Sequence, residues 1–101
     1  MKLYDVKLLT VTCEILAQKY VNDILAKYGV TGHTIYDVRG KGEKGVRGEG
    51  LQDQKNVKIE VVLSKDKLEK IIEEITSTLF ADLTIIFYVS DIQVVRIEKF
   101  L

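Results

Sequence analysis

Residues 57–89 read VKIEVVLSKDKLEKIIEEITSTLFADLTIIFYV, and this stretch changes its hydrophobic periodicity twice. Over residues 57–63 apolar and charged side chains largely alternate, which is typical of a strand with one buried face. Over residues 64–79 the apolar side chains recur every three or four positions, which predicts an amphipathic helix. The continuous apolar run at 83–89 predicts a central strand covered on both faces. The stretch therefore predicts a strand, a helix and a second strand.

The start of this second helix has two candidate caps. Ser64 or Asp66 can accept a hydrogen bond from the free amides of the first turn. Asp66 and Glu69 have the spacing of a capping box, although that motif prefers Ser or Thr at its first position. The buried stripe of the helix is predicted to contain Leu68, Ile71, Ile72, Ile75 and Leu79.

The N-terminal half repeats the same alternation. Residues 3–11 predict a strand, and residues 13–28 predict a helix whose apolar positions form one face. Thr12 is expected to cap this helix, with Glu14 in the first turn, where the helix dipole favours an acid. Gly29 is well placed to end the helix, and residues 32–39 predict the next strand.

The order of elements predicts the fold class. We expect a single α+β domain over residues 1–101 with the ferredoxin-like order βαββαβ, an antiparallel sheet and two helices on one face. Asp91 is predicted to interrupt the last strand, and residues 94–97 either extend it or form a short further strand. Because the other face of the sheet also carries apolar side chains, we expect self-association to cover it.

Composition excludes several classes of protein. The chain has 101 residues, is 47% hydrophobic and carries 15 basic and 15 acidic side chains, so a general nucleic-acid binder is not expected. The single cysteine, Cys13, allows no internal disulfide. The apolar runs are shorter than the roughly 20 residues of a membrane span, and residues 1–5 do not resemble a signal peptide. We therefore expect a cytoplasmic protein.

The strongest local motif is a glycine-rich segment. Residues 39–50 read RGKGEKGVRGEG and hold five of the seven glycines, which predicts a flexible loop and not a strand. Backbone amides and the cations Lys41, Lys44 and Arg47 suit an anion such as phosphate. The pattern is neither a Walker A motif nor a Rossmann fingerprint. The alternative reading is a solvated loop whose cations bind nothing.

The remaining reactive residues do not form a catalytic pattern. His33 is the only histidine, and with Cys13 it supplies too few ligands for a recognisable metal site. Cys13 has no evident base or orienting partner in the sequence. Glu69, Glu73 and Glu74 are most simply the solvated face of a helix. We predict no catalytic residue, no enzymatic activity and no bound metal.

One stretch resembles a known family. Residues 29–42, GVTGHTIYDVRGKG, resemble the end of the first helix and the second strand of PII signalling proteins, which run into a long loop called the T-loop. Residues 57–62 are similar to the strand that leaves that loop, and residues 94–97 to the last strand segment. By this resemblance the T-loop covers residues 40–56. Gly40-Lys41-Gly42, with the following cations, is similar to the PII-like branch associated with bicarbonate transporters or carboxysomes.

The chain departs from PII proteins in three places. Its T-loop has no tyrosine, so uridylylation is not expected. Residues 79–84 lack the glycines and lysine of the usual phosphate-binding loop, which argues against ATP and 2-oxoglutarate sensing. The C-terminal cysteine pair of some transporter-associated relatives is also absent from the sequence.

The resemblance implies a PII-like signal-transduction protein. It would be a homotrimer that binds adenine nucleotides in clefts between subunits and regulates a partner protein, such as a membrane transporter, through the T-loop. No nucleic-acid partner is implied. The nucleotide-binding residues that it implies are Thr34, Gly40, Lys41, Gly42, Lys44, Arg47, Val62 and Arg96.

These residues would contact different parts of the nucleotide. Thr34 and the backbone around Val62 would meet the adenine, and residues 40–42 would lie near ribose and phosphate. Lys44 and Arg47 would reach the phosphates, and ligand binding would then order the T-loop, an order–disorder switch.

The last strand segment affects the expected ligand. Arg96 matches a phosphate-contacting arginine of the family, whereas Glu98 stands where the next basic residue would be. This change favours AMP, ADP or cyclic AMP over ATP.

Two alternatives with a related fold stay open. One is a trimeric metal-handling protein of the cation-tolerance type, which needs more ligands than Cys13 and His33. The other is a small hydrolase of the acylphosphatase type, which needs an anion-binding arginine where this chain has residues 9–12, Leu-Thr-Val-Thr.

Overall fold

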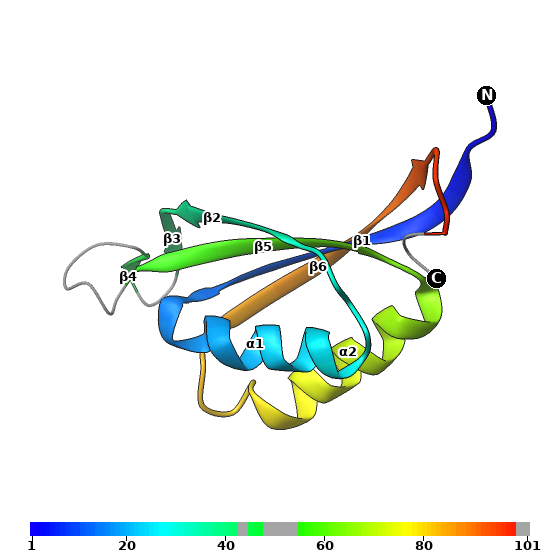
Figure 1. Ribbon diagram of the computed structural model, residues 1–101. Coiled ribbons are helices and arrows are strands. Elements are labelled where there is room, and N and C mark those ends of the chain that lie inside the picture. Colours follow the sequence, from blue (N-terminus) through cyan, green and yellow to red (C-terminus); the bar gives the residue numbers. More distant parts are fainter. Residues whose placement is uncertain (43–44, 48–54, 99–101) are drawn as a thin grey trace.

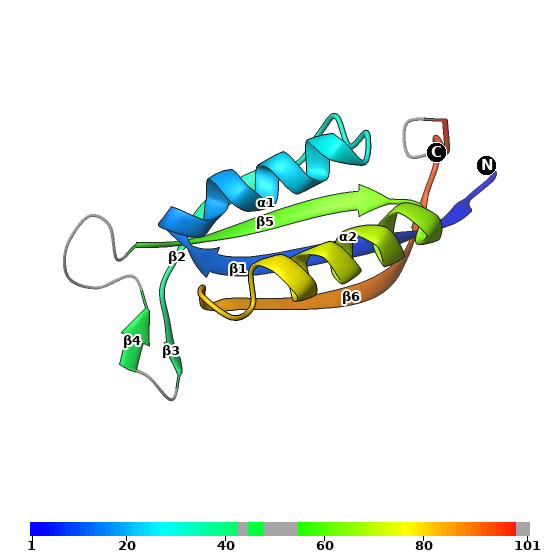
Figure 2. The same cartoon turned by 90° about the horizontal axis from the view of Figure 1, so that it is seen from below.

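A computed structural model describes residues 1–42, 45–47 and 55–98 (Figure 1). Its main sheet has the strand order β2-β5-β1-β6, with every neighbouring pair antiparallel. Both helices lie on the same face of this sheet (Figures 1 and 2). The predicted ferredoxin-like βαββαβ fold is confirmed. The elements in chain order are β1 Tyr4–Glu14, α1 Ile15–Lys27, β2 Thr34–Val38, β3 Gly40–Gly42, β4 Gly45–Arg47, β5 Asn56–Leu63, α2 Lys65–Thr78 and β6 Ile85–Val94.

The core lies between the sheet and the two helices. Alternate residues of β1 and β5 face the helices and are almost inaccessible to solvent, as expected for strands with one covered face. Each helix buries one apolar stripe against them, which removes apolar surface from water and stabilises the fold. The buried core residues with no accessible surface are Leu9, Val11, Ala17, Val21, Ile59, Val61, Ile71 and Ile75.

The first strand is longer than predicted. It continues through Thr12 to Glu14 because these residues pair with β5 on one side and, as far as Cys13, with β6 on the other. Thr12 is therefore not a helix cap, and Glu14 is the N-cap residue without a side-chain capping bond. The first helical amide, that of Ile15, donates instead to the carbonyl oxygen of Lys55 at 2.7 Å.

The ends of both helices follow from local chemistry. Gly29 has φ +80°, and its amide donates to Ala26 O while the amide of Val30 donates to Leu25 O. This is a Schellman ending, in which glycine takes the left-handed conformation at low cost, as predicted. At the start of α2 the cap is Ser64, whose hydroxyl accepts from the amide of Lys67 at 3.4 Å. The alternative cap, Asp66, lies in the first turn.

The last strand differs from the prediction in three ways. Asp91 does not interrupt β6, because it lies opposite Lys7 in the register and forms an ion pair with it. The strand ends at Val94, so residues 95–97 add no strand. Residues 83–89 also do not form a central strand, because β6 is an edge of the sheet within this chain.

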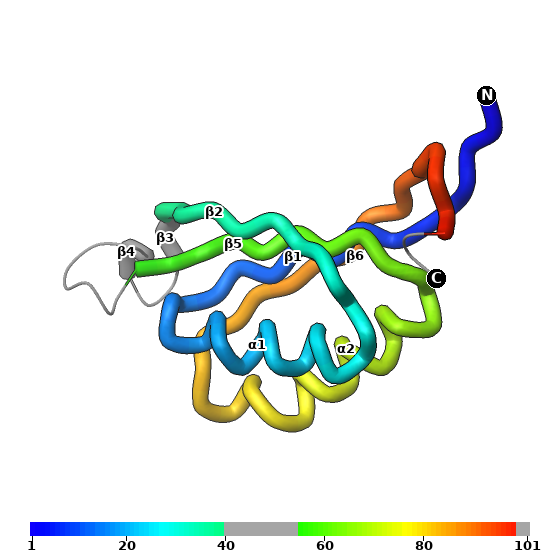
Figure 3. The backbone as a smooth tube through the Cα atoms, in the orientation of Figure 1, coloured from blue at the N-terminus to red at the C-terminus, as the bar shows by residue number. Residues whose placement is uncertain are grey.

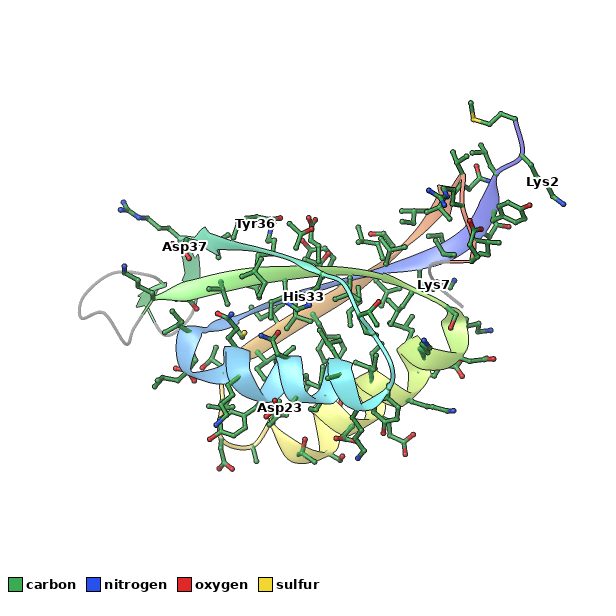
Figure 4. All side chains as sticks on the ribbon, viewed as in Figure 1. Lys2, Lys7, Asp23, His33, Tyr36 and Asp37 are labelled. Atoms are coloured by element: carbon green, nitrogen blue, oxygen red, sulfur yellow. The ribbon has the colours of Figure 1, made fainter. Side chains whose placement is uncertain are left out.

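The second face of the sheet is open in the single chain. Ile85 and Phe87 pack toward the helices, whereas Ile86 and Tyr88 are 41% and 49% exposed. Tyr36 of β2 is also exposed and lies on the side away from the helices (Figure 4). Burial within one chain therefore explains only part of the apolar character of residues 83–89.

The glycine-rich segment contains a second, small sheet. Strands β3 and β4 pair antiparallel with Gly40 opposite Arg47, so the prediction of no strand here is wrong for these six residues. Backbone pairing needs no side chain, which is why the composition did not indicate it. Strands β3 and β4 lie at one end of the molecule, while the N-terminus and residues 95–98 lie at the other (Figure 1).

Candidate functional site

A cleft of about 680 Å³ lies beside the end of β5. One wall is the connection from α1 to β2, which Figure 3 follows as it passes from the helix layer up to the sheet. The other walls come from β5, from the first turn of α2 and from the C-terminal segment. The lining residues are Gly29, Val30, Thr31, Gly32, His33, Thr34, Glu60, Val62, Leu63, Lys67 and Glu98.

The cleft exists because neighbouring strands differ in length. β2 begins at Thr34, which lies opposite Glu60, whereas β5 continues to Leu63. Residues 61–63 therefore pair with β1 on one side, and no residue of β2 pairs with them on the other. An unpaired strand edge presents backbone donors and acceptors that require partners. In this molecule the open edge of β5 faces the cleft.

Charged side chains of both signs surround the cleft. Glu60 and Glu98 contribute carboxylates, and Lys67 contributes an ammonium group whose Nζ lies 3.5 Å from the carbonyl oxygen of Gly29. His33, labelled in Figure 4, is exposed on the connecting wall. Such a site offers hydrogen-bond donors and acceptors together, which suits a ligand that carries both.

Of the predicted site residues that the structure describes, two line this cleft. Thr34 and Val62 both line it, from β2 and from the open edge of β5. Their contact with a ligand stays a prediction. Arg96 is exposed and donates through Nε to the carboxylate of Glu98 at 3.2 Å, so it adjoins a lining residue without lining the cleft itself.

Four other predicted residues lie at the opposite end of β2. Gly40, Lys41 and Gly42 form β3, Arg47 belongs to β4, and Lys44 lies outside the described residues. Four residue steps separate Thr34 from Val38, which corresponds to about 13 Å along an extended strand. A separate hollow of about 230 Å³ lies at this end, lined by Asp37, Val38, Arg39, Lys55 and Asn56.

Sequence reasoning missed most of the cleft lining. The lining residues that the sequence does not indicate are those of the connection at 29–33, Glu60 and Leu63 of β5, and Lys67. For Glu98 the sequence indicates only an effect on phosphate affinity. The sequence predicts strands of similar length at residues 32–39 and 57–63, and two such strands would leave no open edge. The one available signal was the pair Gly29 and Gly32, which bracket a connection without strand character.

Cys13 and His33 are the two residues that could act as a nucleophile or as metal ligands, and they lie in different environments. Cys13 is 1% exposed, and burial, together with the neighbouring Glu14 charge, raises its pKa to about 11. The thiol therefore stays protonated near neutral pH. His33 lies on the exposed cleft wall, away from the buried core that holds Cys13. Among the described residues, His, Cys, Asp and Glu side chains form no cluster of three or more suited to a metal ion.

Glu74 is not simply part of a solvated face. Its carboxylate accepts from Lys27 Nζ and from Tyr28 Oη, both at 2.7 Å, and so joins the end of α1 to α2. These hydrogen bonds, first from Lys27 and then from Tyr28, lower the pKa of Glu74, and the same contacts raise the pKa values of Lys27 and Tyr28. Glu69 and Glu73 are exposed, as predicted.

No helix within the described part of the chain is long and apolar enough to cross a membrane.

Comparison with known proteins agrees with this architecture. The family model for nitrogen regulatory protein P-II matches residues 6–99. A PII-like signalling protein from Thermus thermophilus is 28% identical, with a TM-score of 0.85 and full coverage of both chains. CPII, a nitrogen regulatory PII-like protein from Thiomonas intermedia, was solved with ADP and bicarbonate; that structure is 30% identical over 99% of this chain and 98% of its own, with a TM-score of 0.88.

A second CPII structure contains ADP, AMP and bicarbonate. It is 29% identical, covers 98% of this chain and 96% of its own, and has a TM-score of 0.89. No curated protein sequence matches the chain.

Proposed function

Because this chain belongs to the nitrogen regulatory protein P-II family, we propose that it senses an adenine nucleotide in the cleft beside β5 and signals through its T-loop. The resemblance to the PII-like branch is confirmed by the family match and by the similarity to CPII. The chain is thus a PII-like signalling protein.

The open edge of β5 is the observation that carries the nucleotide proposal. Among the described residues, no strand pairs with residues 61–63 on the side of the cleft, and the connection at 29–34 forms the opposite wall. The edge of a purine base carries hydrogen-bond donors and acceptors, as a neighbouring strand would. Adenine can therefore replace the missing strand beside Val62, with the hydroxyl of Thr34 as a further partner. The structures of CPII with ADP and AMP support this class of ligand.

Charge in the cleft favours a short phosphate chain. Glu60 and Glu98 line the same space, and a polyphosphate tail near two carboxylates would be repelled. Arg96 offsets one of these charges through its ion pair with Glu98. We therefore propose AMP, ADP or cyclic AMP as the ligand in preference to ATP, with no metal and no chemical turnover.

The uncovered face of the sheet supports a homotrimer. Ile86, Tyr88 and Tyr36 expose large apolar or aromatic side chains there, and removal of such surface from water favours association. Within one chain the cleft and the β3–β4 hairpin lie at opposite ends of β2. In the proposed trimer, clefts between subunits would let one ligand reach residues of two chains.

The T-loop is the proposed output. Ligand contacts near residues 40–42 and at Lys44 and Arg47 would change the order of residues 40–56, at an entropic cost of about 1–2 kcal/mol for each residue fixed. The ordered loop would then fit, or no longer fit, a partner protein in the cytoplasm, for which a membrane transporter is our candidate.

Calorimetric titration with AMP, ADP, ATP and cyclic AMP tests the ligand, and light scattering tests the assembly. We expect at least one of AMP, ADP and cyclic AMP to bind more tightly than ATP, and we expect a particle of three times the 11.5 kDa chain mass. Thr34→Val removes the hydroxyl at nearly constant volume and should weaken binding. A protein that binds none of the four nucleotides would contradict the sensor proposal, and a stable monomer would contradict the intersubunit site.

A further inference from the structure

The ammonium group of Lys67 is the cleft feature that the resemblance did not implicate. Lys67 lies in the first turn of α2, where its backbone amide donates to the Ser64 cap. Its side chain is half-buried and crosses to the end of α1, where Nζ lies 3.5 Å from Gly29 O. The position of this cation is therefore determined by two elements that also form walls of the cleft.

This contact leaves the ammonium able to bind a ligand. A separation of 3.5 Å lies at the long end of the hydrogen-bond range, so the bond to Gly29 is weak. An ammonium group has three donors, and this contact engages one of them. A Cβ atom at position 29 would lie 3.5 Å from Nζ, which is an ordinary van der Waals contact, so glycine is favoured at this position by the turn and not by the lysine.

The neighbouring charges indicate which part of a nucleotide Lys67 meets. Glu60 and Glu98 line the same cleft, so this space disfavours phosphate groups, whereas a base and a ribose are uncharged. A nucleoside presents acceptors to an ammonium, namely ring nitrogens and ribose oxygens. It also presents donors to carboxylates, namely amino and hydroxyl groups.

From this arrangement we propose that Lys67 binds the nucleoside part of the ligand and determines the affinity of the cleft for it. The inference rests on the proposed nucleotide function and adds a residue and a chemical role to it. Loss of Lys67 should therefore weaken the binding of adenosine, AMP and ADP by the same factor, because all three ligands share the lost contact.

The test compares Lys67→Met with Lys65→Met. Methionine keeps most of the apolar stem of lysine and removes the charge. Lys65 is the matched control, because it is a cation in the same helical turn that does not line the cleft. Removal of a cation from the start of a helix is favourable to its dipole, so both variants should fold.

Titration of each protein with adenosine, AMP and ADP gives the result. We expect Lys67→Met to weaken the binding of all three ligands by about tenfold. This factor corresponds to the loss of about 1.4 kcal/mol from a charge-assisted contact. Lys65→Met should leave the three affinities unchanged. Wild-type affinity in Lys67→Met overturns the inference while the nucleotide proposal stands. A loss that grows from adenosine to ADP overturns the assignment to the nucleoside, and an equal loss in Lys65→Met shows a general charge effect instead. A wild-type protein that binds none of the three contradicts the nucleotide proposal itself.

Discussion

The substitution Ile15→Pro tests how the end of the T-loop is attached to the domain. The amide of Ile15 donates to the carbonyl oxygen of Lys55 at 2.7 Å, just before β5 begins. Proline lacks this donor but suits the first position of a helix, because its φ of about −65° is already helical. Glu14, at ψ 151°, has the extended conformation that a residue before proline prefers. The substitution therefore removes one donor with little backbone strain.

The expected free-energy change can be estimated from this geometry. Loss of the hydrogen bond costs about 0.5–1.5 kcal/mol, because water can replace the donor at the exposed Lys55. Ile15 is partly buried against the core, and loss of part of its side chain costs about 0.8 kcal/mol for each buried methylene. The reduced entropy of the unfolded chain offsets about 0.4–1 kcal/mol. We expect a net loss of about 1 kcal/mol in the free energy of unfolding.

Hydrogen exchange of the amides at residues 55–57 is the informative assay. A lost bond of this strength should increase their exchange about twofold to tenfold in Ile15→Pro. Ile15→Ala is the control, because it truncates the side chain further but keeps the amide donor. If Ile15→Ala accelerates exchange at residues 55–57 as much as Ile15→Pro does, side-chain packing and not the Lys55 hydrogen bond holds this end of the loop.

Three further predictions concern single residues. If Arg47 makes a charge-assisted phosphate contact, Arg47→Ala should weaken the binding of AMP and ADP about tenfold to a hundredfold in calorimetry and leave the affinity for adenosine unchanged. An equal loss of affinity for adenosine would contradict that role. Cys13, with its pKa raised to about 11 by burial, should react with iodoacetamide at pH 8 at least roughly a hundredfold more slowly than a free cysteine. Its rate should recover in urea, and fast alkylation of the folded protein would show that the core opens readily. The lowered pKa of Glu74 means that its contribution to stability is present above the unfolded pKa, near 4.5, and is lost as pH falls through the lower folded value. Urea denaturation between pH 3 and 7 should therefore show a shallower acid decline for Glu74→Gln than for wild type, and identical pH profiles would exclude this contribution.

The sequence by itself determined the order of the main-sheet strands and the two helices, and the C-terminal end of α1. Periodicities of two and of three to four residues report which side chains are buried, and this information lies within each segment. Gly29 illustrates the point, because its φ of +80° depends only on the helix that it ends. The family could also be inferred, because residues 29–42 and 57–62 keep their order and spacing, and the family model confirms it.

Only the tertiary structure decided where the strands end relative to one another. Thr12 and Glu14 belong to β1, and Asp91 belongs to β6, because strands distant in sequence pair with them. Alternation within one strand cannot report the length of its neighbour. The cleft depends on that comparison, since it lies where β5 extends beyond β2, and Lys67 lines it because the start of α2 packs beside the end of α1. Strand lengths and helix packing are relations between segments, so the candidate site could be located only after the chain had folded.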